Sequence, residues 1–132
     1  MARLIQVKVK VDNGTELTAL IDCGSQIDIL NSQSHLSTQI PMDKTVSTVM
    51  RDAGQRDTSL HGRCYSVNIY LGELQTVTDL WVGGNIPYDV VLGRSWTRRN
   101  GISIDEQSTG TWLASRNLQG DVLWELCAVP AQ

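Results

Sequence analysis

The stretch TALIDCGSQIDIL, residues 18–30, places a carboxylate between two apolar segments. An apolar run ends at Asp22, Cys23 and Gly24 follow, and residues 27–30 are again largely apolar. A carboxylate at the end of a buried strand needs partners, because burying it alone is costly. Glycine permits a tight turn at this point. The stretch therefore predicts two strands joined by a turn that presents Asp22, although an aspartate that only binds nearby turn amides is the simpler alternative.

Most of the remaining chain alternates apolar and polar residues, which is typical of strands. Asn13-Gly14 between the first two alternating runs is a strong hairpin signal. Residues 94–100 read as the one short helix, with Gly101 suited to end it. Residues 31–43 are polar and predict a loop with one helical turn near 34–38. The chain is thus expected to be all-β, with strands over 4–11, 16–22, 27–30, 45–50, 58–72, 74–82 and 88–93, a hairpin over 101–115 and a last strand over 121–129.

Composition limits the classes of protein to which the chain can belong. Its 132 residues with 41% hydrophobic content suffice for one compact core. The net charge of −3 argues against a nucleic-acid partner. No apolar run approaches the roughly 18 residues of a membrane span, and no signal-peptide pattern is present, so we expect a cytoplasmic protein without a membrane partner. The cysteines at 23, 64 and 127 match neither a disulfide framework nor a metal site.

Three segments in order, ALIDCGS (19–25), DAGQ (52–55) and YDVVLGR (88–94), give the chain a family likeness. It resembles the retropepsin-like aspartic proteases, the single-lobe peptidases of retroviruses and of long-terminal-repeat retrotransposons of the Ty3/gypsy type, or genes derived from them. The resemblance covers most of residues 4–100. It implies a single domain over 1–132 with a retropepsin-like closed β-barrel or sandwich, one short helix near 94–100, and an extra hairpin and strand over 101–129.

The resemblance also implies a reaction. Aspartic peptidases use two carboxylates that face one water and share one proton, one acting as base and the other as acid. This chain has one Asp-x-Gly-Ser and no second copy. An active enzyme would therefore be a homodimer with Asp22 from each subunit as the catalytic residue. Its expected substrate is a polypeptide, the polyprotein of the element, and no cofactor or metal is expected.

Further site residues follow from the same likeness. The Ser25 hydroxyl is expected to bond the Asp22 carboxylate, and residues 50–57 correspond to the flap hairpin that closes over substrate. Support of the active loop is assigned to Cys23, Gly24, Ser25 and Arg94. Substrate binding is assigned to Gln26, Ile27, Met50, Arg51, Asp52, Ala53, Gly54, Ile86, Pro87, Tyr88 and Val91.

Cys23 departs from the family pattern, in which this position is Ser or Thr and its hydroxyl bonds across the dimer. A thiol is a weaker donor. This leaves a second interpretation, a catalytically weak or inactive dimerisation or peptide-binding module with the same fold. A third interpretation is a thiol enzyme in which His35 or His61 activates Cys23.

Overall fold

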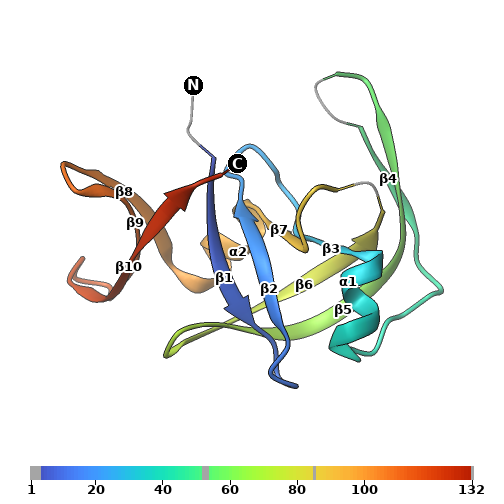
Figure 1. The fold of residues 1–132 in the computed structure, drawn as a ribbon, viewed down its shortest axis with the longest axis horizontal. Coiled ribbons are helices and arrows are strands. Elements are labelled where there is room, and N and C mark those ends of the chain that lie inside the picture. Colours follow the sequence, from blue (N-terminus) through green and yellow to red (C-terminus); the bar gives the residue numbers. More distant parts are fainter. Residues whose placement is uncertain (1–3, 52–53, 85, 132) are drawn as a thin grey trace.

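Strands make up most of the computed structural model, which describes residues 4–51, 54–84 and 86–131. Ten strands and two short helices lie in these residues (Figure 1). In chain order the elements are β1 (Ile5–Lys10), β2 (Glu16–Ile21), β3 (Ile29–Asn31), α1 (Ser32–Thr38), β4 (Thr48–Arg51), β5 (Asp57–Leu71), β6 (Leu74–Gly83), β7 (Val90–Leu92), α2 (Arg94–Asn100), β8 (Ile102–Gln107), β9 (Gly110–Arg116) and β10 (Val122–Pro130). The all-β prediction is confirmed, and the helix predicted over 94–100 has those bounds.

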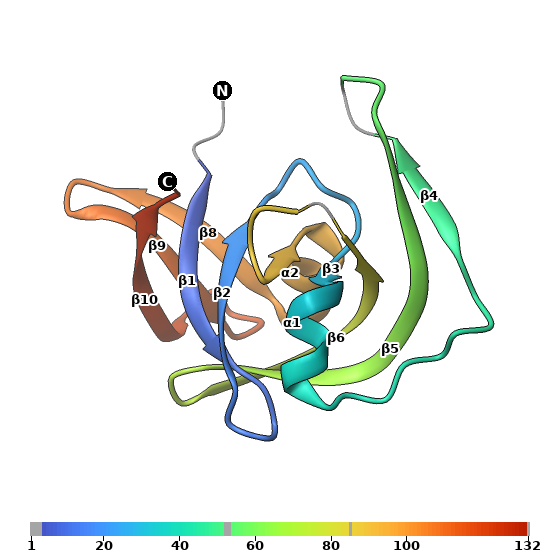
Figure 2. The ribbon, with the colours of Figure 1, turned by 45° about the vertical axis from the view of Figure 1, so that its right-hand side comes forward.

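The strands are hydrogen-bonded in the order β4-β5-β6-β3-β7-β2-β1-β10-β9-β8. Alternation in β1 and β2 buries one face of each strand, and the predicted turn at Asn13-Gly14 joins them, with Gly14 at a φ of 85°. One further pair, Lys10 with Tyr70, connects β1 to β5. That contact bends the sheet back on itself into a ring, visible in Figure 2, that is less regular than the closed barrel predicted.

The two short strands β3 and β7 connect β6 to β2 in the sheet. Strand β7 lies between β2 and β3, parallel to β2 and antiparallel to β3. Strand β3 in turn runs parallel to β6. Residues 22–28 must therefore leave the sheet at the end of β2 and return beside β7, which makes them a loop that is partly exposed at Cys23, Gly24 and Gln26 and buried at Asp28.

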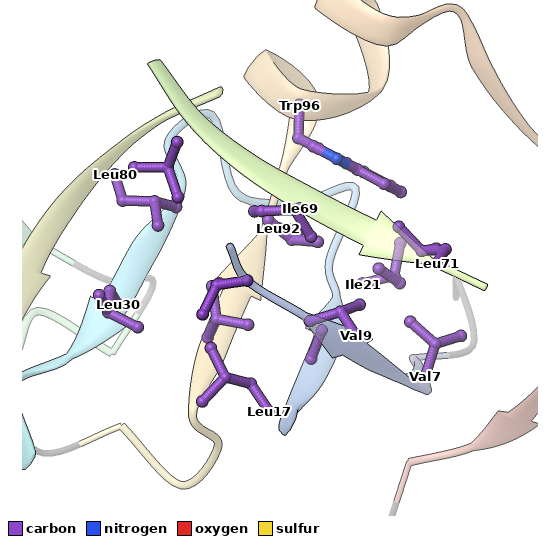
Figure 3. Packing of buried hydrophobic residues seen from close by; sticks show 14 of the residues in the cluster. Val7, Val9, Leu17, Ile21, Leu30, Ile69, Leu71, Leu80, Leu92 and Trp96 are labelled. Atoms are coloured by element: carbon purple, nitrogen blue, oxygen red, sulfur yellow. The ribbon is translucent and has the colours of Figure 1, made fainter. Parts of the chain in front are cut away.

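The core lies between the β1–β2 pair, the β5–β6 hairpin and α2 (Figure 3). Trp96 is its largest fully buried side chain. The indole N–H donates to Thr76 Oγ1 at 2.8 Å, so the ring is buried without an unpaired donor. Strands β8 to β10 extend the sheet at its other end, where β10 pairs with β1 at Ile5–Pro130.

Helix α1 corrects the prediction of one helix. Residues 32–38 have no apolar stripe, so the sequence predicted a loop with one helical turn near 34–38, and the helix is two residues longer at its start. The helix forms because Asn31 caps it by accepting from the Gln33 amide, and because Ser34 donates to Asp89 at 2.6 Å. Strand β4 also begins later than predicted, since the Asp43 carboxylate accepts from the backbone and side chain of Thr45 and forms a turn.

Neither helix in the described part of the chain has the length and apolar character that crossing a membrane requires.

Candidate active site

Asp22 stands at the start of the loop, directly after β2. Its backbone amide donates to Leu92 in β7 at 2.9 Å, which ties the residue to the sheet. Its carboxylate accepts from the Gly24 amide at 2.9 Å, and its carbonyl accepts from the Ser25 amide at 3.0 Å. Asp22 is half-buried, so the turn fixes the carboxylate while leaving it accessible.

Ser25 does not bond the Asp22 carboxylate, contrary to our expectation. Its hydroxyl donates instead to the carbonyl of Ile27 at 2.7 Å, within the same loop. The backbone of the loop passes very close to Gly93, where an added Cβ would lie 2.4 Å from the Ser25 carbonyl oxygen. The loop thus folds onto Gly93, and the serine stabilises its curvature.

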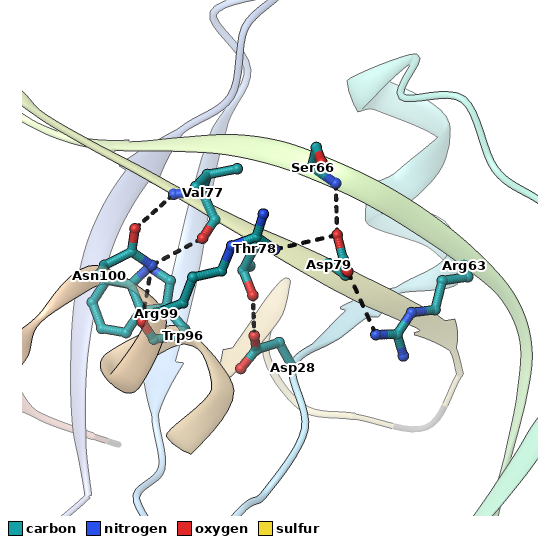
Figure 4. A network of polar contacts seen from close by, with 9 residues as sticks. All are labelled: Asp28, Arg63, Ser66, Val77, Thr78, Asp79, Trp96, Arg99 and Asn100. Atoms are coloured by element: carbon teal, nitrogen blue, oxygen red, sulfur yellow. Dashed lines mark hydrogen bonds and ion pairs between the residues drawn. The ribbon is translucent and has the colours of Figure 1, made fainter.

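A buried carboxylate, Asp28, fastens the end of the loop from behind (Figure 4). It accepts from the Gly93 amide at 2.7 Å and from the Thr78 hydroxyl, and the Trp96 amide adds a further hydrogen bond. Gly93 is the N-cap of α2 and has no side chain to cap it, so Asp28 performs this role from the loop that precedes β3. Burial nevertheless raises the pKa of Asp28, because it penalises the charged form more than these hydrogen bonds favour it.

Helix α2 is held at its other end as well. The Asn100 side chain exchanges two 2.9 Å hydrogen bonds with the backbone of Val77, as a neighbouring strand would. Together with Asp28, this joins the loop, α2 and β6 into one polar network (Figure 4).

A groove of about 900 Å³ opens above the loop. Residues of the loop and of β4 line it, and Figure 2 shows these two segments facing each other across the top of the molecule. Among the described residues that line the groove, Asp22 is the single carboxylate. The predicted site residues that line it are Asp22, Gly24, Ser25, Gln26, Ile27, Met50, Arg51, Ile86, Pro87 and Val91.

Other assigned residues lie elsewhere. Tyr88 lines a smaller pocket on the α1 side, together with Asn31 and Asp89, and the Asp89 carboxylate accepts from the Thr18 amide in β2. Gly54 is exposed at the hairpin and is not among the groove residues. Asp52 and Ala53 fall outside the described residues.

The groove has an aromatic wall that the sequence did not predict. Trp81 lines it from β6, and the Arg63 guanidinium lies over the indole ring, 4.4 Å from its centroid. Parallel pairing of β3 with β6 turns this face of β6 toward the loop. The other unassigned lining residues are Leu20, Ile29, Thr48 and Val49.

An ion pair lies where the arms of the hairpin meet its connecting turn. Arg51 and Asp57 are paired across β4 and β5, and Arg51 Nε lies 3.0 Å from the Asp57 carboxylate. Both side chains are more than half exposed, so the pair adds little stability but sets the register of the two arms.

Cys23 is exposed beside Asp22. Burial of its sulfur and the Asp22 carboxylate both raise the pKa of the thiol, against a smaller lowering by Arg94. His35 Nε2 lies 2.7 Å from the Ile40 carbonyl oxygen, so this ring is already hydrogen-bonded to the segment that follows α1. A raised pKa opposes a thiolate nucleophile, which argues against the thiol-enzyme interpretation.

No group of three or more His, Cys, Asp or Glu side chains able to hold a metal ion occurs in the described ranges.

Comparison with solved structures decides the fold. The chain is similar to the crystal structure of the retroviral protease-like domain of Ddi1 from Leishmania major, with a TM-score of 0.75 over 98% of this chain and 97% of that one. The fold is retropepsin-like. The identity between the two chains is 16%, so the likeness concerns the fold. No protein-family model and no curated protein matches the chain.

The retropepsin-like fold explains why the loop has a strand on each side. Of the residues predicted to form a flap, Met50 and Arg51 lie in β4 and Asp57 begins β5.

Proposed function

We propose that this chain is one half of a homodimeric aspartic endopeptidase that cleaves a retroelement polyprotein, and that it belongs to such an element or to a gene derived from one. The observation that supports it is Asp22, the single carboxylate among the described residues that line the groove, held by a tight turn. The rest of the lining is mostly apolar, with Arg51 as its one guanidinium. A carboxylate presented in this way lacks the partner that its reaction requires.

The chemistry needs a second acid. One ionised carboxylate abstracts a proton from water, and the water oxygen attacks the peptide carbonyl. The other carboxylate, protonated, donates its proton to the carbonyl oxygen. Two such groups in contact share one proton, because both cannot ionise together. A second copy of Asp22 supplies that acid if two chains meet on a two-fold axis.

The groove suits an extended peptide. It lies between a loop and a β-hairpin, two segments that offer backbone hydrogen bonds, and its walls include Ile27, Val91 and Trp81. Side chains of alternating direction along a bound strand would therefore meet apolar surface, and apolar residues next to the cleaved bond are expected.

Cys23 sets the strength of the dimer in this proposal. A thiol donates weaker and longer hydrogen bonds than a hydroxyl, so it holds the partner loop less firmly. Cys23→Thr should lower the dissociation constant of the dimer, measured by sedimentation equilibrium, and raise cleavage at subunit concentrations near that constant.

The deciding experiment is cleavage of a peptide library from pH 3 to 7 by the wild-type chain, by Asp22→Asn and by Glu73→Gln. Glu73 is exposed in the turn between β5 and β6 and provides the same chemical change away from the groove. Activity lost in Asp22→Asn and kept in Glu73→Gln supports the peptidase. A folded dimer that cleaves nothing at any pH would contradict it and leave the peptide-binding module.

A further inference from the structure

A basic pocket lies beside the groove. Its volume is about 320 Å³, and its lining residues are Gln26, Arg94, Ser95 and Arg98. Gln26 also lines the groove, so the two depressions share a wall. A peptide that leaves the groove over Gln26 would next meet the two guanidinium groups.

These two charges are not neutralised by the protein. Arg94 and Arg98 are four residues apart in α2 and therefore lie on one face of it. In the parts of the chain that the structure describes, neither has an acidic group within ion-pair distance, whereas the adjacent Arg99 pairs with Asp79 at 3.5 Å. Like charges at this spacing repel, and an anion between them would relieve the repulsion.

The backbone amides at the start of α2 are not available for this purpose. The Gly93 amide donates to Asp28, and the Arg94 amide donates to the Ser25 carbonyl at 2.8 Å. The Ser95 hydroxyl is likewise engaged with the Gln26 carbonyl at 2.7 Å. Recognition of an anion would therefore depend on the guanidinium groups, whose planar forks match a carboxylate.

We propose that Arg94 and Arg98 form an outer subsite that selects an acidic side chain in the peptide, beyond the apolar residues that occupy the groove. The inference rests on the proposed function only in that the groove receives a peptide. Arg94 is half-buried and Arg98 is exposed, so the subsite is open to solvent and its selectivity should weaken with salt.

Binding can be measured without cleavage. Asp22→Asn is used as the full-length background, and fluorescence anisotropy follows degenerate peptides with an apolar centre and flanks of Glu, Gln or Lys. Glu-flanked pools should bind about two- to fivefold tighter than Gln-flanked pools at 50 mM salt, as expected for a partly exposed ion pair. The preference should shrink at 300 mM salt.

Variants of Arg98 test whether this side chain selects the acidic residue. Arg98→Gln should abolish most of the preference for Glu, and Arg98→Lys should keep part of it, since the charge remains but the fork is lost. Lys10→Gln, which removes one exposed positive charge from β1, is the matched control and should keep the preference. Circular dichroism checks that each variant is folded.

Equal binding of Glu- and Gln-flanked pools, or no binding of any pool, would overturn the subsite, as would an unchanged preference in Arg98→Gln. The proposed function is judged separately by cleavage. A preference for Glu without cleavage by the wild-type chain would keep the subsite and reject the peptidase. Cleavage by the wild-type chain without a preference for Glu would support the peptidase and reject the subsite.

Discussion

Replacing Asp28 tests whether the active loop depends on the carboxylate behind it. Asp28→Ala would leave the Gly93 amide, the Trp96 amide and the Thr78 hydroxyl without their acceptor. Each unsatisfied buried group costs about 1–3 kcal/mol, so the free energy of unfolding should fall by about 3–9 kcal/mol. This is a large part of the roughly 5–15 kcal/mol that a domain of this size has.

Asp28→Asn separates hydrogen bonding from charge. The amide oxygen can still accept from Gly93, and its N–H₂ can donate to the Thr78 hydroxyl, which rotates to accept. We expect a loss of about 1 kcal/mol, much less than for alanine.

The two proteins should also differ in pH dependence. Because the pKa of Asp28 is raised from 3.8, the folded protein binds this proton more tightly than the unfolded chain. Its contribution to stability is complete below the unfolded pKa and is lost as pH rises through the folded pKa. The stability of the wild type relative to Asp28→Asn should therefore fall with rising pH in that window.

Urea denaturation followed by tryptophan fluorescence, from pH 3 to 8, measures both effects. Buried Trp96 provides the signal. A loss below 1 kcal/mol in Asp28→Ala, or a difference between wild type and Asp28→Asn that does not change with pH, would refute the reasoning.

Three other changes follow from the packing. Gly93→Ala places a Cβ 2.4 Å from a carbonyl oxygen of the active loop and should destabilise the protein by about 1–3 kcal/mol, measured by the urea midpoint at constant m-value. Leu113→Ala, at a fully buried position, should cost about 2–5 kcal/mol, while Leu118→Ala, at a fully exposed one, should change the melting temperature little; similar losses in both would contradict the core assignment. Burial raises the pKa of the Cys64 thiol to about 11, so iodoacetamide at pH 8 should label the two exposed cysteines first and Cys64 only in urea, as counted by mass spectrometry.

Local signals predicted much of the fold because they depend on neighbouring residues. Alternation identified the long strands β5 and β6, and Asn13-Gly14 identified the first hairpin. The sequence also predicted the helix over 94–100 and its end at Gly101, which is the C-cap and has a φ of 62°. Helix α1 was predicted only as one helical turn near 34–38, because one of its stabilising contacts, from Ser34 to Asp89, spans 55 residues.

The site was predicted in part for the same reason. Asp22 and its turn are contiguous in sequence, so the motif was visible. Asp28 and Trp81 were not assigned roles, since the partners of Asp28 at Thr78 and Gly93 lie 50 and 65 residues away. Alternation along β6 predicts which residues lie on the same face as Trp81. It does not predict which face lines the groove, because that depends on the pairing of β6 with β3.

The position of β7 has a consequence for the order of folding. The loop after β2 is fastened by residues that arrive late, because Gly93 reaches Asp28 across 65 residues of chain. Closing such a loop costs entropy that is repaid only when the distant strand docks, so the turn around Asp22 should form in the last, slowest step of folding. During synthesis, a chain that has not yet emerged beyond β7 would have its hairpins in place and its carboxylate still unpositioned. Assembly of the reactive loop is thereby delayed until nearly the whole ring of strands exists.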